Sequence, residues 1–484
     1  MAESTEENAL AFAPLERLAP LVARGKISPV ELVELAARRI ERLNPSLNAF
    51  LALALDSARR EARRAEREIR AGRRRGPLHG IPLSIKDNIL TRGVVTTAGS
   101  KILAGYRPAA DAAAVRHLTR AGAILLGKTN LHEFAYGITS ENPHYGPVRN
   151  PWDTRRIAGG SSGGSAAALA AGIGWGSVGS DTGGSVRIPA SLCGVVGLKP
   201  TFGSVSCEGV TPLSPSLDHV GPLAASVTGV AWLLDAIAGR RPPAAAGRPW
   251  APPRRSGGSR GRPLARARIG RASGNFAQGV DPEVRAAVEA AARQFERLGA
   301  AIREISLPGV DRWVAEAAEI AFAEARDYHE SAGFFPARAQ EYGEDVRRHL
   351  DRGGEIRATD YLAAMRHMRE ARAGWNRMLE GCDALLAPAT PIPAPLLGEK
   401  TVTIEGREET VRSALLRLCR PANFTGAPAL VLPCGLTRAG LPIGLQLMGP
   451  LGGEDGLLAI GYAYEQAAPW RHRHPAGISE VLVE

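Results

Sequence analysis

The chain has 484 residues, a length that suits either one large α/β domain or two smaller domains. A hydrophobic content of 44% with 23% charged residues is ordinary for a soluble globular protein, and no apolar run is long enough for a membrane helix. The N-terminus carries acidic residues where a secretory signal carries basic ones, so we expect a cytoplasmic protein. The five cysteines are an odd number without a CxxC pair, which argues against a disulfide framework and against a zinc site.

The net charge of +11 is a feature that many nucleic-acid-binding proteins share. Only six of the 60 basic residues are lysines, however, and the arginines are scattered apart from clusters at 59–75 and 254–268. The first cluster alternates with glutamate, as on a solvated helix face. The second lies mostly in the Pro- and Gly-rich stretch 240–265, which indicates a surface loop. Because an arginine-biased composition explains most of the excess, we expect no specific nucleic-acid partner.

In chain order, the first clear element is a helix that begins at Ser28. This residue can cap the helix, Pro29 suits its first turn, and Glu31 completes a capping box. A second helix is expected at about residues 51–72. The later segments predict strands at 80–89, 121–130, 301–308, 383–390, 428–434 and 442–448, and helices at 111–121, 281–297 and within 311–380. This alternation predicts one α/β sheet covered by helices on both faces.

Glycine- and serine-rich segments admit several interpretations. Residues 122–129 match the P-loop pattern GxxxxGK[ST], but the four intervening residues are apolar, as in a strand. Residues 158–165 contain the nucleophile-elbow pattern GxSxG with Ser161 at its centre, although the preceding PWDTRRIA is a poor strand. The downstream pair Asp218 and His219 is adjacent in sequence, and adjacent residues rarely serve together in one Ser–His–Asp triad. A Gly/Ser turn that only begins a helix remains an alternative.

A second Gly/Ser loop, residues 179–190, places Ser185 after two glycines. Successive backbone N–H groups from Thr182 to Ser185 can converge as an oxyanion hole. Upstream, Lys86 follows an apolar run that should be largely buried, in a chain that uses arginine almost everywhere else. An ammonium can lose its proton when it is desolvated, whereas a guanidinium cannot, and a neutral lysine is a competent base for a serine hydroxyl. The alternatives are a tight turn into a helix and an exposed, solvated lysine.

These three segments, in this order, resemble the amidase signature family. The motif of that family is GGSSGGS followed by DTGGSxRxPA, with a lysine upstream in GIPxxxKDN. Ser185 lies 24 residues after Ser161, which lies 75 residues after Lys86, and the family uses this order and approximate separation. The resemblance is strong over residues 70–230 and looser over 380–465.

The resemblance implies a catalytic mechanism without a metal or organic cofactor. Ser185 would attack an amide carbonyl, and Ser161, in a cis peptide bond with Gly160, would pass the proton of Ser185 to neutral Lys86. Water would then hydrolyse the acyl-enzyme. The backbone N–H groups that would hold the oxyanion are those of Thr182, Gly183, Gly184 and Ser185. The residues that would order the two loops are Ser162, Asp181 and Arg187, of which Arg187 would alternatively face a substrate carboxylate.

The fold that the resemblance implies is a single α/β domain over residues 1–484, with a large twisted mixed sheet between helices. Its parts are an N-terminal helical segment (1–75), the signature core (76–230), a surface loop (240–265), a variable, mainly helical region (280–380) and the C-terminal part of the sheet (381–484). N-terminal helices often serve dimerisation in this family, so a homodimer is one expected state.

We expect an amidase that hydrolyses a small-molecule substrate, which would be an aryl or aliphatic amide or a carbamate or ester relative. The residues that would line its pocket, or would equally belong to the core, are Phe134, Tyr136, Ile138 and Phe424. An alternative is the glutaminase component of a tRNA-dependent amidotransferase, which carries the same motifs and works only in an assembly. Segment 343–372 looks more like stand-alone amidases. Further alternatives are a Ser–His–Asp hydrolase that uses His219 and a non-catalytic binding protein on the same fold.

Overall fold

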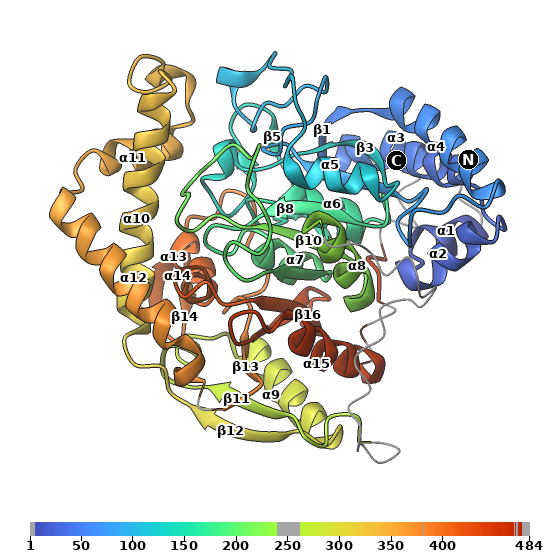
Figure 1. Cartoon of the computed structure of the whole chain (residues 1–484). Helices are drawn as coiled ribbons and strands as arrows, with labels where there is room; N and C mark the ends of the chain where they lie inside the picture. The colour runs from blue at the N-terminus through green and yellow to red at the C-terminus, as the bar shows by residue number, and fades with distance from the viewer. Residues whose placement is uncertain (1–4, 240–261, 380, 469, 471–472, 477–484) are drawn as a thin grey trace.

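A large mixed β-sheet organises the computed structural model, which describes residues 5–239, 262–379, 381–468, 470 and 473–476. The sheet has 11 strands in the order β1-β3-β2-β8-β10-β9-β16-β17-β13-β11-β12 (Figure 1). In chain order these strands are β1 (Phe50–Leu53), β2 (Pro82–Lys86), β3 (Ile124–Thr129), β8 (Ser177–Ser180), β9 (Val196–Lys199), β10 (Val220–Ala224), β11 (Arg268–Ala272), β12 (Ala301–Ile305), β13 (Ala384–Pro388), β16 (Ala429–Leu436) and β17 (Pro442–Met448). β2 is parallel to β3 and β8, β11 is parallel to β12 and β13, and the remaining pairs are antiparallel.

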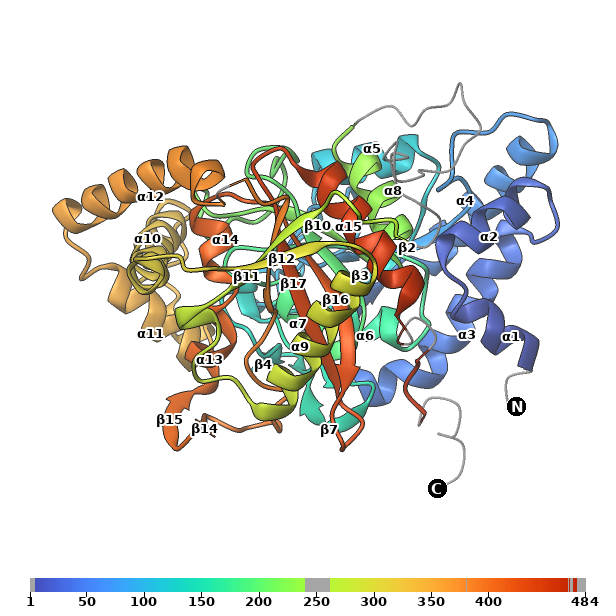
Figure 2. The same cartoon turned by 90° about the horizontal axis from the view of Figure 1, so that it is seen from below.

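Helices cover both faces of this sheet (Figure 2). On one face lie α6 (Gly163–Ala170) and α7 (Arg187–Cys193). On the other face lie α8 (Val227–Ile237), α9 (Pro282–Arg297) and α15 (Glu454–Ala467). Strands between two helical layers must be apolar on both sides, and every residue of β13 and β17 is buried. The predicted α/β sheet with helices on both faces is therefore confirmed.

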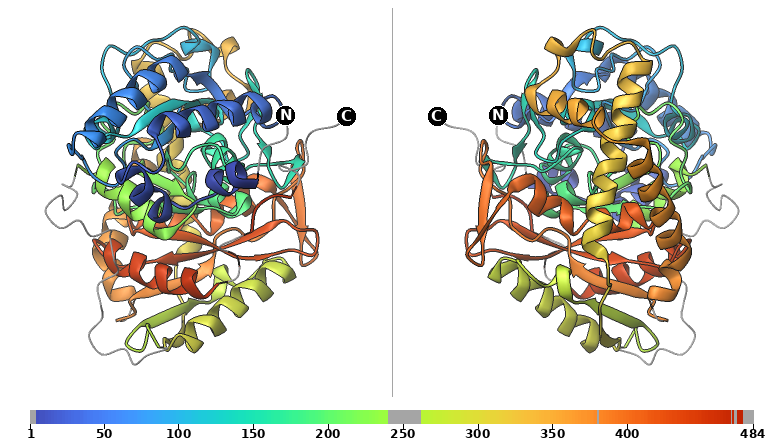
Figure 3. Two further views of the ribbon diagram at one scale, coloured as in Figure 1. Left: turned by 90° about the vertical axis from the view of Figure 1, so that its right-hand side faces the viewer. Right: turned by 90° about the vertical axis from the view of Figure 1, so that its left-hand side faces the viewer.

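The N-terminal helices pack at the β1 end of the sheet (Figure 3, left). They are α1 (Thr5–Ala11), α2 (Leu15–Ala23), α3 (Pro29–Leu47) and α4 (Leu55–Arg70). α3 has the capping box that the sequence predicts: Oγ of Ser28 accepts the N–H of Val30 at 3.0 Å, and Glu31 accepts the N–H of Ser28 at 2.9 Å. The helix predicted at 51–72 is shorter in the structure, because residues 50–53 pair with β3 as an edge strand.

A group of three helices lies on the opposite side of the molecule (Figure 3, right). These helices are α10 (Val310–Ser331), α11 (Glu344–Gly353) and α12 (Ala358–Met378), in the region expected to be mainly helical. α10 packs against α13 (Val411–Arg417) and α14 (Arg420–Phe424), two short helices that precede β16. This packing brings residues from the last quarter of the chain next to the loops of the signature core.

The remaining elements are short. They are α5 (Ala113–Arg120), the strands β4 (Glu141–Asn142), β5 (Gly146–Pro147), β6 (Arg149–Asn150), β7 (Asp153–Ile157), β14 (Thr401–Ile404) and β15 (Arg407–Thr410), and 3-10 helices at Lys101–Leu103, Glu133–Ala135, Gly274–Phe276 and Ala339–Glu341. Most of the surface loop expected at 240–265, residues 240–261, lies outside the described residues. Among the helices that the structure describes, none combines the length and the apolar character needed to cross a membrane.

Candidate active site

Lys86 is the last residue of β2, and its side chain is fully buried. Because the parallel strands β2 and β8 end at the same edge of the sheet, Lys86 lies next to Ser180, the last residue of β8. Nζ of Lys86 lies 2.8 Å from Oγ of Ser180 and 2.6 Å from Oγ of Ser161. Burial lowers the pKa of Lys86 to about 7, against the opposing attraction of Asp181 and Asp218. Neutral and charged forms of this lysine are therefore both populated near neutral pH.

Ser161 lies in the loop before α6, and the peptide bond between Gly160 and Ser161 is cis. The loop is closely packed, because a Cβ on Gly160 would lie only 2.9 Å from the backbone nitrogen of Ser140. Ser162 joins this loop to the following one, since its N–H donates to the carbonyl of Ser185 at 3.1 Å. The two Gly/Ser loops of the sequence are thus in direct contact.

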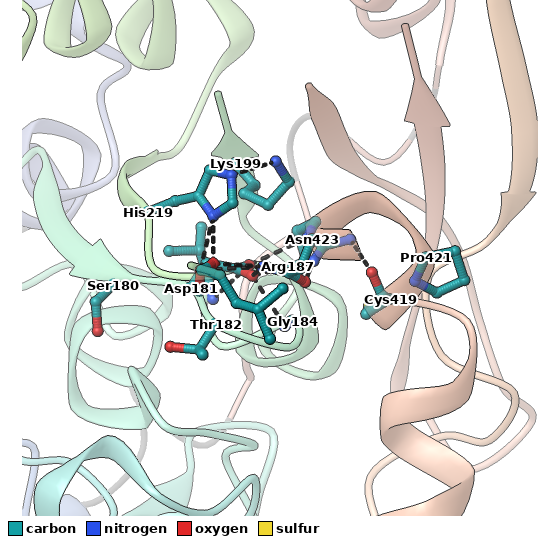
Figure 4. Close-up of polar contacts among 12 residues, drawn as sticks. Ser180, Asp181, Thr182, Gly184, Arg187, Lys199, His219, Cys419, Pro421 and Asn423 are labelled. Atoms are coloured by element: carbon teal, nitrogen blue, oxygen red, sulfur yellow. Dashed lines mark hydrogen bonds and ion pairs between the residues drawn. The ribbon is translucent and has the colours of Figure 1, made fainter. Parts of the chain in front are cut away.

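The loop that carries Ser185 is wrapped around a buried carboxylate. Asp181 accepts the N–H of Gly184 at 2.9 Å and that of Val186 at 3.1 Å. Arg187 donates to both oxygens of the same carboxylate, at 3.0 and 3.1 Å, and both side chains are fully buried (Figure 4). Burial alone would raise the pKa of Asp181, but Arg187 and Asn423 outweigh it and hold the pKa below its ordinary value. The carboxylate is therefore ionised and orders the loop.

All five N–H groups of Arg187 have acceptors inside the protein. Two donate to Asp181, and the others donate to the carbonyl of Cys419 at 2.8 Å and to the side chains of Gln446 at 3.0 Å and Asn423 at 2.6 Å. All three acceptors come from the C-terminal part of the chain, and Figure 4 labels two of them, Cys419 and Asn423. This guanidinium therefore connects the Ser185 loop to α14 and β17.

The N–H groups expected to hold an oxyanion are engaged to different degrees. The N–H of Gly184 donates to Asp181, whereas those of Thr182, Gly183 and Ser185 have no acceptor among the residues that the structure describes. In the same part of the chain, no hydrogen bond joins the hydroxyls of Ser161 and Ser185. Hydrogen bonds of this kind are often long without substrate and shorten in the complex. The loop thus presents three unengaged N–H groups around Ser185.

Lys199, another fully buried lysine, lies beside His219 (Figure 4). Nζ of Lys199 lies 3.0 Å from Nε2 of His219, and Nδ1 of His219 lies 2.7 Å from the carbonyl of Leu217. Burial and the neighbouring Lys199 lower the pKa of His219 well below its ordinary value, so the ring is neutral, with Nδ1–H donating to Leu217. Within the described structure His219 has no hydrogen bond to Ser161 or Ser185. The Ser–His–Asp alternative therefore lacks the contact between histidine and nucleophile.

Sequence reasoning did not single out three residues that complete these contacts. Ser180 accepts from both Lys86, at 2.8 Å, and the side-chain amide of Asn88, at 3.0 Å. Asn423 donates to Asp181 at 2.9 Å although 242 residues separate them. Asn88 and Ser180 lie inside or beside the family motifs and could have been found there, whereas no local pattern marks Asn423.

A small pocket of about 30 Å³ opens onto Ser185. The residues that line it include Tyr136, Ile138, Thr182, Gly183, Ser185, Leu213, Ala317, Ala321, Arg412, Leu416 and Arg420. Two of the four residues expected at a pocket, Tyr136 and Ile138, are thus among them. Phe134 instead packs edge-on against His329 with ring centres 4.5 Å apart, and Phe424 stacks on Trp313 at 6.2 Å, within hydrophobic clusters.

Comparison with known proteins places these features in a family. The family model named Amidase matches residues 31–458. The A component of the glutamyl-tRNA(Gln) amidotransferase of Cyanothece sp. (strain PCC 7425 / ATCC 29141) is 39% identical, over 93% of this chain and 96% of the relative. A solved structure described as a crystal structure of amidase is 38% identical, with a TM-score of 0.85, and covers 94% of this chain and 100% of its own. The crystal structure of the corresponding glutamyl-tRNA(Gln) amidotransferase component from Thermotoga maritima is 33% identical, with a TM-score of 0.74, over 94% of this chain and 95% of its own.

These relatives correct two expectations drawn from the sequence. The main expectation, an amidase for small-molecule amides, is wrong, because similar curated proteins over most of the chain are named as the A component of a glutamyl-tRNA(Gln) amidotransferase. The expected partners, a small-molecule amide and no specific nucleic acid, are wrong on the same ground. The physical reason is that the motif residues determine the bond that is cleaved, whereas substrate and partners depend on surfaces outside the motifs.

The family itself follows from the match over most of the chain together with the buried lysine, the two serine loops and the mixed sheet. The chain belongs to the amidase signature family, whose enzymes are hydrolases that act on C–N bonds.

Proposed function

We propose that this chain is the glutaminase component of a tRNA-dependent amidotransferase. It would hydrolyse the side-chain amide of glutamine and supply the ammonia for amidation of glutamyl-tRNA(Gln) in an assembly with partner proteins. The names of the relatives, which match more than nine-tenths of the chain, support this substrate and this assembly. The observation that carries the chemistry is the 2.6 Å contact between the buried Nζ of Lys86 and Oγ of Ser161, beside the Ser185 loop.

In the proposed mechanism Ser185 is the nucleophile. Its Oγ forms a bond to the amide carbon while its proton passes to Oγ of Ser161, and the proton of Ser161 passes to neutral Lys86. The C–N bond then breaks, and the proton returns from Lys86 through Ser161 to the leaving nitrogen, which departs as ammonia. Water attacks the ester on Ser185 by the same proton route and releases glutamate. Each proton that leaves a nucleophile is thus returned, and no external acid or base is needed.

The oxyanion of each tetrahedral intermediate lies, in this proposal, against the backbone N–H groups of Thr182, Gly183 and Ser185. Gly184 supports the loop instead, since its own N–H is engaged by Asp181. Donors that are already oriented stabilise developing charge without reorganisation, and one such donor contributes about 3 kcal/mol to the barrier reduction. The Asp181 carboxylate would keep these donors in place.

We assign supporting roles to the residues around the nucleophile. Arg187 holds Asp181 and not a substrate carboxylate, because its five N–H groups already have protein acceptors. Ser162 keeps the two loops together through its N–H bond to the carbonyl of Ser185. Ser180 orients the amine of Lys86, since its Oγ lies 2.8 Å from Nζ.

The test uses the tagged chain purified together with the partner proteins that co-purify with it. Release of glutamate from glutamine and formation of glutaminyl-tRNA(Gln) are measured for the wild type and for Ser185→Ala and Lys86→Ala. We expect both substitutions to lower kcat/KM for glutamine by at least about 10³-fold, as for other residues that act as one catalytic unit. Lys26→Ala removes an exposed lysine and should leave the rate unchanged. The proposal would be contradicted if the wild-type chain, purified with its partner proteins, left glutamine intact. Glutaminase activity that survives in Ser185→Ala would also contradict it.

A further inference from the structure

Two arginines line the Ser185 pocket without a carboxylate partner. Arg412 belongs to α13 and Arg420 begins α14, and both are partly buried. Arg420 donates to the carbonyl of Val314 at 3.3 Å, and Arg412 lies over the ring of Tyr136 at 5.9 Å. In the described part of the chain neither forms an ion pair. Both guanidinium groups therefore retain unused N–H donors at the edge of the pocket.

A neighbouring arginine, Arg417, does have a carboxylate partner, so within residues 411–420 the lack of one is confined to the arginines that line the pocket. Arg417 lies between the two in sequence but belongs to the opposite side of α13. It lies 3.6 Å from Glu409 and donates to the carbonyls of Asn275 and Gly279. Of the three arginines in this stretch, 411–420, only the two that line the pocket form no ion pair with an acidic residue in the described structure.

Arg420 lies directly against the loop that would hold the oxyanion. A Cβ placed on Gly183 would be 3.7 Å from Nε of Arg420. Burial, together with the neighbouring charge of Arg412, lowers the pKa of Arg420 to about 9. Two cations that face one small pocket repel each other, and a bound anion relieves that repulsion.

Acidic groups are missing from the described lining of the pocket, which contains no aspartate or glutamate. The carboxylates that lie nearby are already engaged. Asp218 accepts from the hydroxyl of Thr182 at 2.5 Å, and Asp345 lies 2.7 Å from Nε2 of His132. A substrate ammonium in this pocket would therefore meet two cations and no free carboxylate.

We propose that Arg412 and Arg420 form a carboxylate subsite that binds the anionic end of the substrate while Ser185 attacks its amide. This inference rests on the proposed function, under which the subsite takes the α-carboxylate of glutamine. Guanidinium groups bind carboxylates through paired N–H donors, which adds geometric selectivity to charge. The α-ammonium contributes nothing to binding, because the pocket offers it no acidic partner.

The size of the pocket adds a further requirement. A volume of about 30 Å³ corresponds to roughly one water molecule, so the substrate must displace side chains on entry. Arg412 and Arg420 are the long, flexible side chains among the lining residues. They are therefore the groups that would move away from each other to admit the substrate and then close on its carboxylate.

Three amides separate the contributions of the two charged groups. Glutaramate carries the carboxylate without the ammonium, pentanamide carries neither group, and glutamine carries both. With the chain purified together with its partner proteins, we expect kcat/KM for glutaramate to exceed that for pentanamide by at least about 30-fold. It should also equal or exceed kcat/KM for glutamine. Arg412→Gln with Arg420→Gln should lower the glutaramate-to-pentanamide ratio at least tenfold. The control Arg407→Gln removes one positive charge from an exposed position on β15 by the same type of substitution and should leave the ratio unchanged.

Binding provides a readout that does not depend on turnover or on partner proteins. Titration calorimetry on Ser185→Ala should give a glutaramate Kd at least tenfold below that of pentanamide, and the Arg412→Gln/Arg420→Gln background should remove the difference. Where the glutamine variants fail to fold, Arg412→Lys and Arg420→Lys replace them. Lysine retains the charge but lacks the paired N–H donors of a guanidinium group. Equal Kd values for the two amides in Ser185→Ala with both arginines intact, or a difference that survives both arginine substitutions, would overturn the subsite.

The outcomes also distinguish the subsite from the proposed function. Tight binding or hydrolysis of glutaramate without any reaction of glutamine would keep the subsite and refute the glutaminase. If glutamine is hydrolysed and the ratio of its kcat/KM to that of pentanamide is the same in the arginine variants as in the wild type, the glutaminase stands and the subsite is refuted. Glutamine bound more tightly than glutaramate would overturn the claim that the ammonium is not recognised.

Discussion

Lys86 offers the sharpest test, because its proposed role requires the neutral amine. Its pKa is lowered to about 7 by burial, from an ordinary value of 10.5. For a base with this pKa the neutral fraction rises from about 0.09 at pH 6 to about 0.9 at pH 8. We therefore expect kcat/KM for glutamine to rise about tenfold over these two pH units and to level off above them.

The assay measures glutamate release by the chain purified with its partner proteins, at subsaturating glutamine and in buffers of constant ionic strength. Lys86→Arg keeps a charged side chain of similar length but cannot lose its proton, so its activity should fall nearly as far as that of Lys86→Ala. A profile that is flat or falls between pH 6 and pH 8 would refute the reasoning. So would a Lys86→Arg variant that keeps more than about a tenth of the wild-type rate.

The same pKa shift makes a prediction about stability, which does not require substrate. Between pH 7 and 10.5 the unfolded chain binds a proton at Lys86 that the folded chain does not, so this group makes the free energy of unfolding increase with pH in that window. At pH 7 and below, the unfavourable contribution of the buried lysine is on the order of 4 kcal/mol. Lys86→Met should therefore raise Tm at pH 7, and the gain should shrink toward pH 10. A gain that is the same at both pH values would show that the pKa of Lys86 is not lowered.

Three further substitutions test the surrounding contacts. Arg187→Met leaves the Asp181 carboxylate buried without its partner and should lower the free energy of unfolding by about 3–5 kcal/mol in urea titrations; a loss below about 1 kcal/mol would contradict the buried pair. Ser180→Ala removes the oxygen 2.8 Å from Nζ of Lys86 and should lower kcat/KM about tenfold with little change in Tm, whereas equal loss of both would indicate a purely structural role. His219→Ala should lower the urea midpoint, because Lys199 loses the acceptor that the ring provides, while most of the activity remains; abolished turnover in a folded variant would restore the Ser–His–Asp alternative.

The sequence was most informative where structure depends on neighbours along the chain. The capping box at Ser28 requires only residues within one helical turn, and the structure contains it. The apolar run ending at Lys86 predicted a buried strand, and β2 is fully buried. The predicted helix at 51–72 was wrong in its first residues, because pairing with β3 outweighs the local preference there. The substrate expectation failed for a related reason, since motif residues describe the reaction and not the pocket.

By itself, then, the sequence determined the order of the family's motif segments, the class of the fold and a family of hydrolases that act on C–N bonds. Only the tertiary structure decided which distant groups meet. The strand order puts β2 beside β8, so that Lys86 contacts Ser161 across 75 residues. It also brings Asn423 to Asp181 and places Arg412 and Arg420 in the lining of the pocket that Ser185 shares, while Arg417 pairs with Glu409. Such contacts depend on how helices and strands pack together, and no pattern of neighbouring residues specifies them.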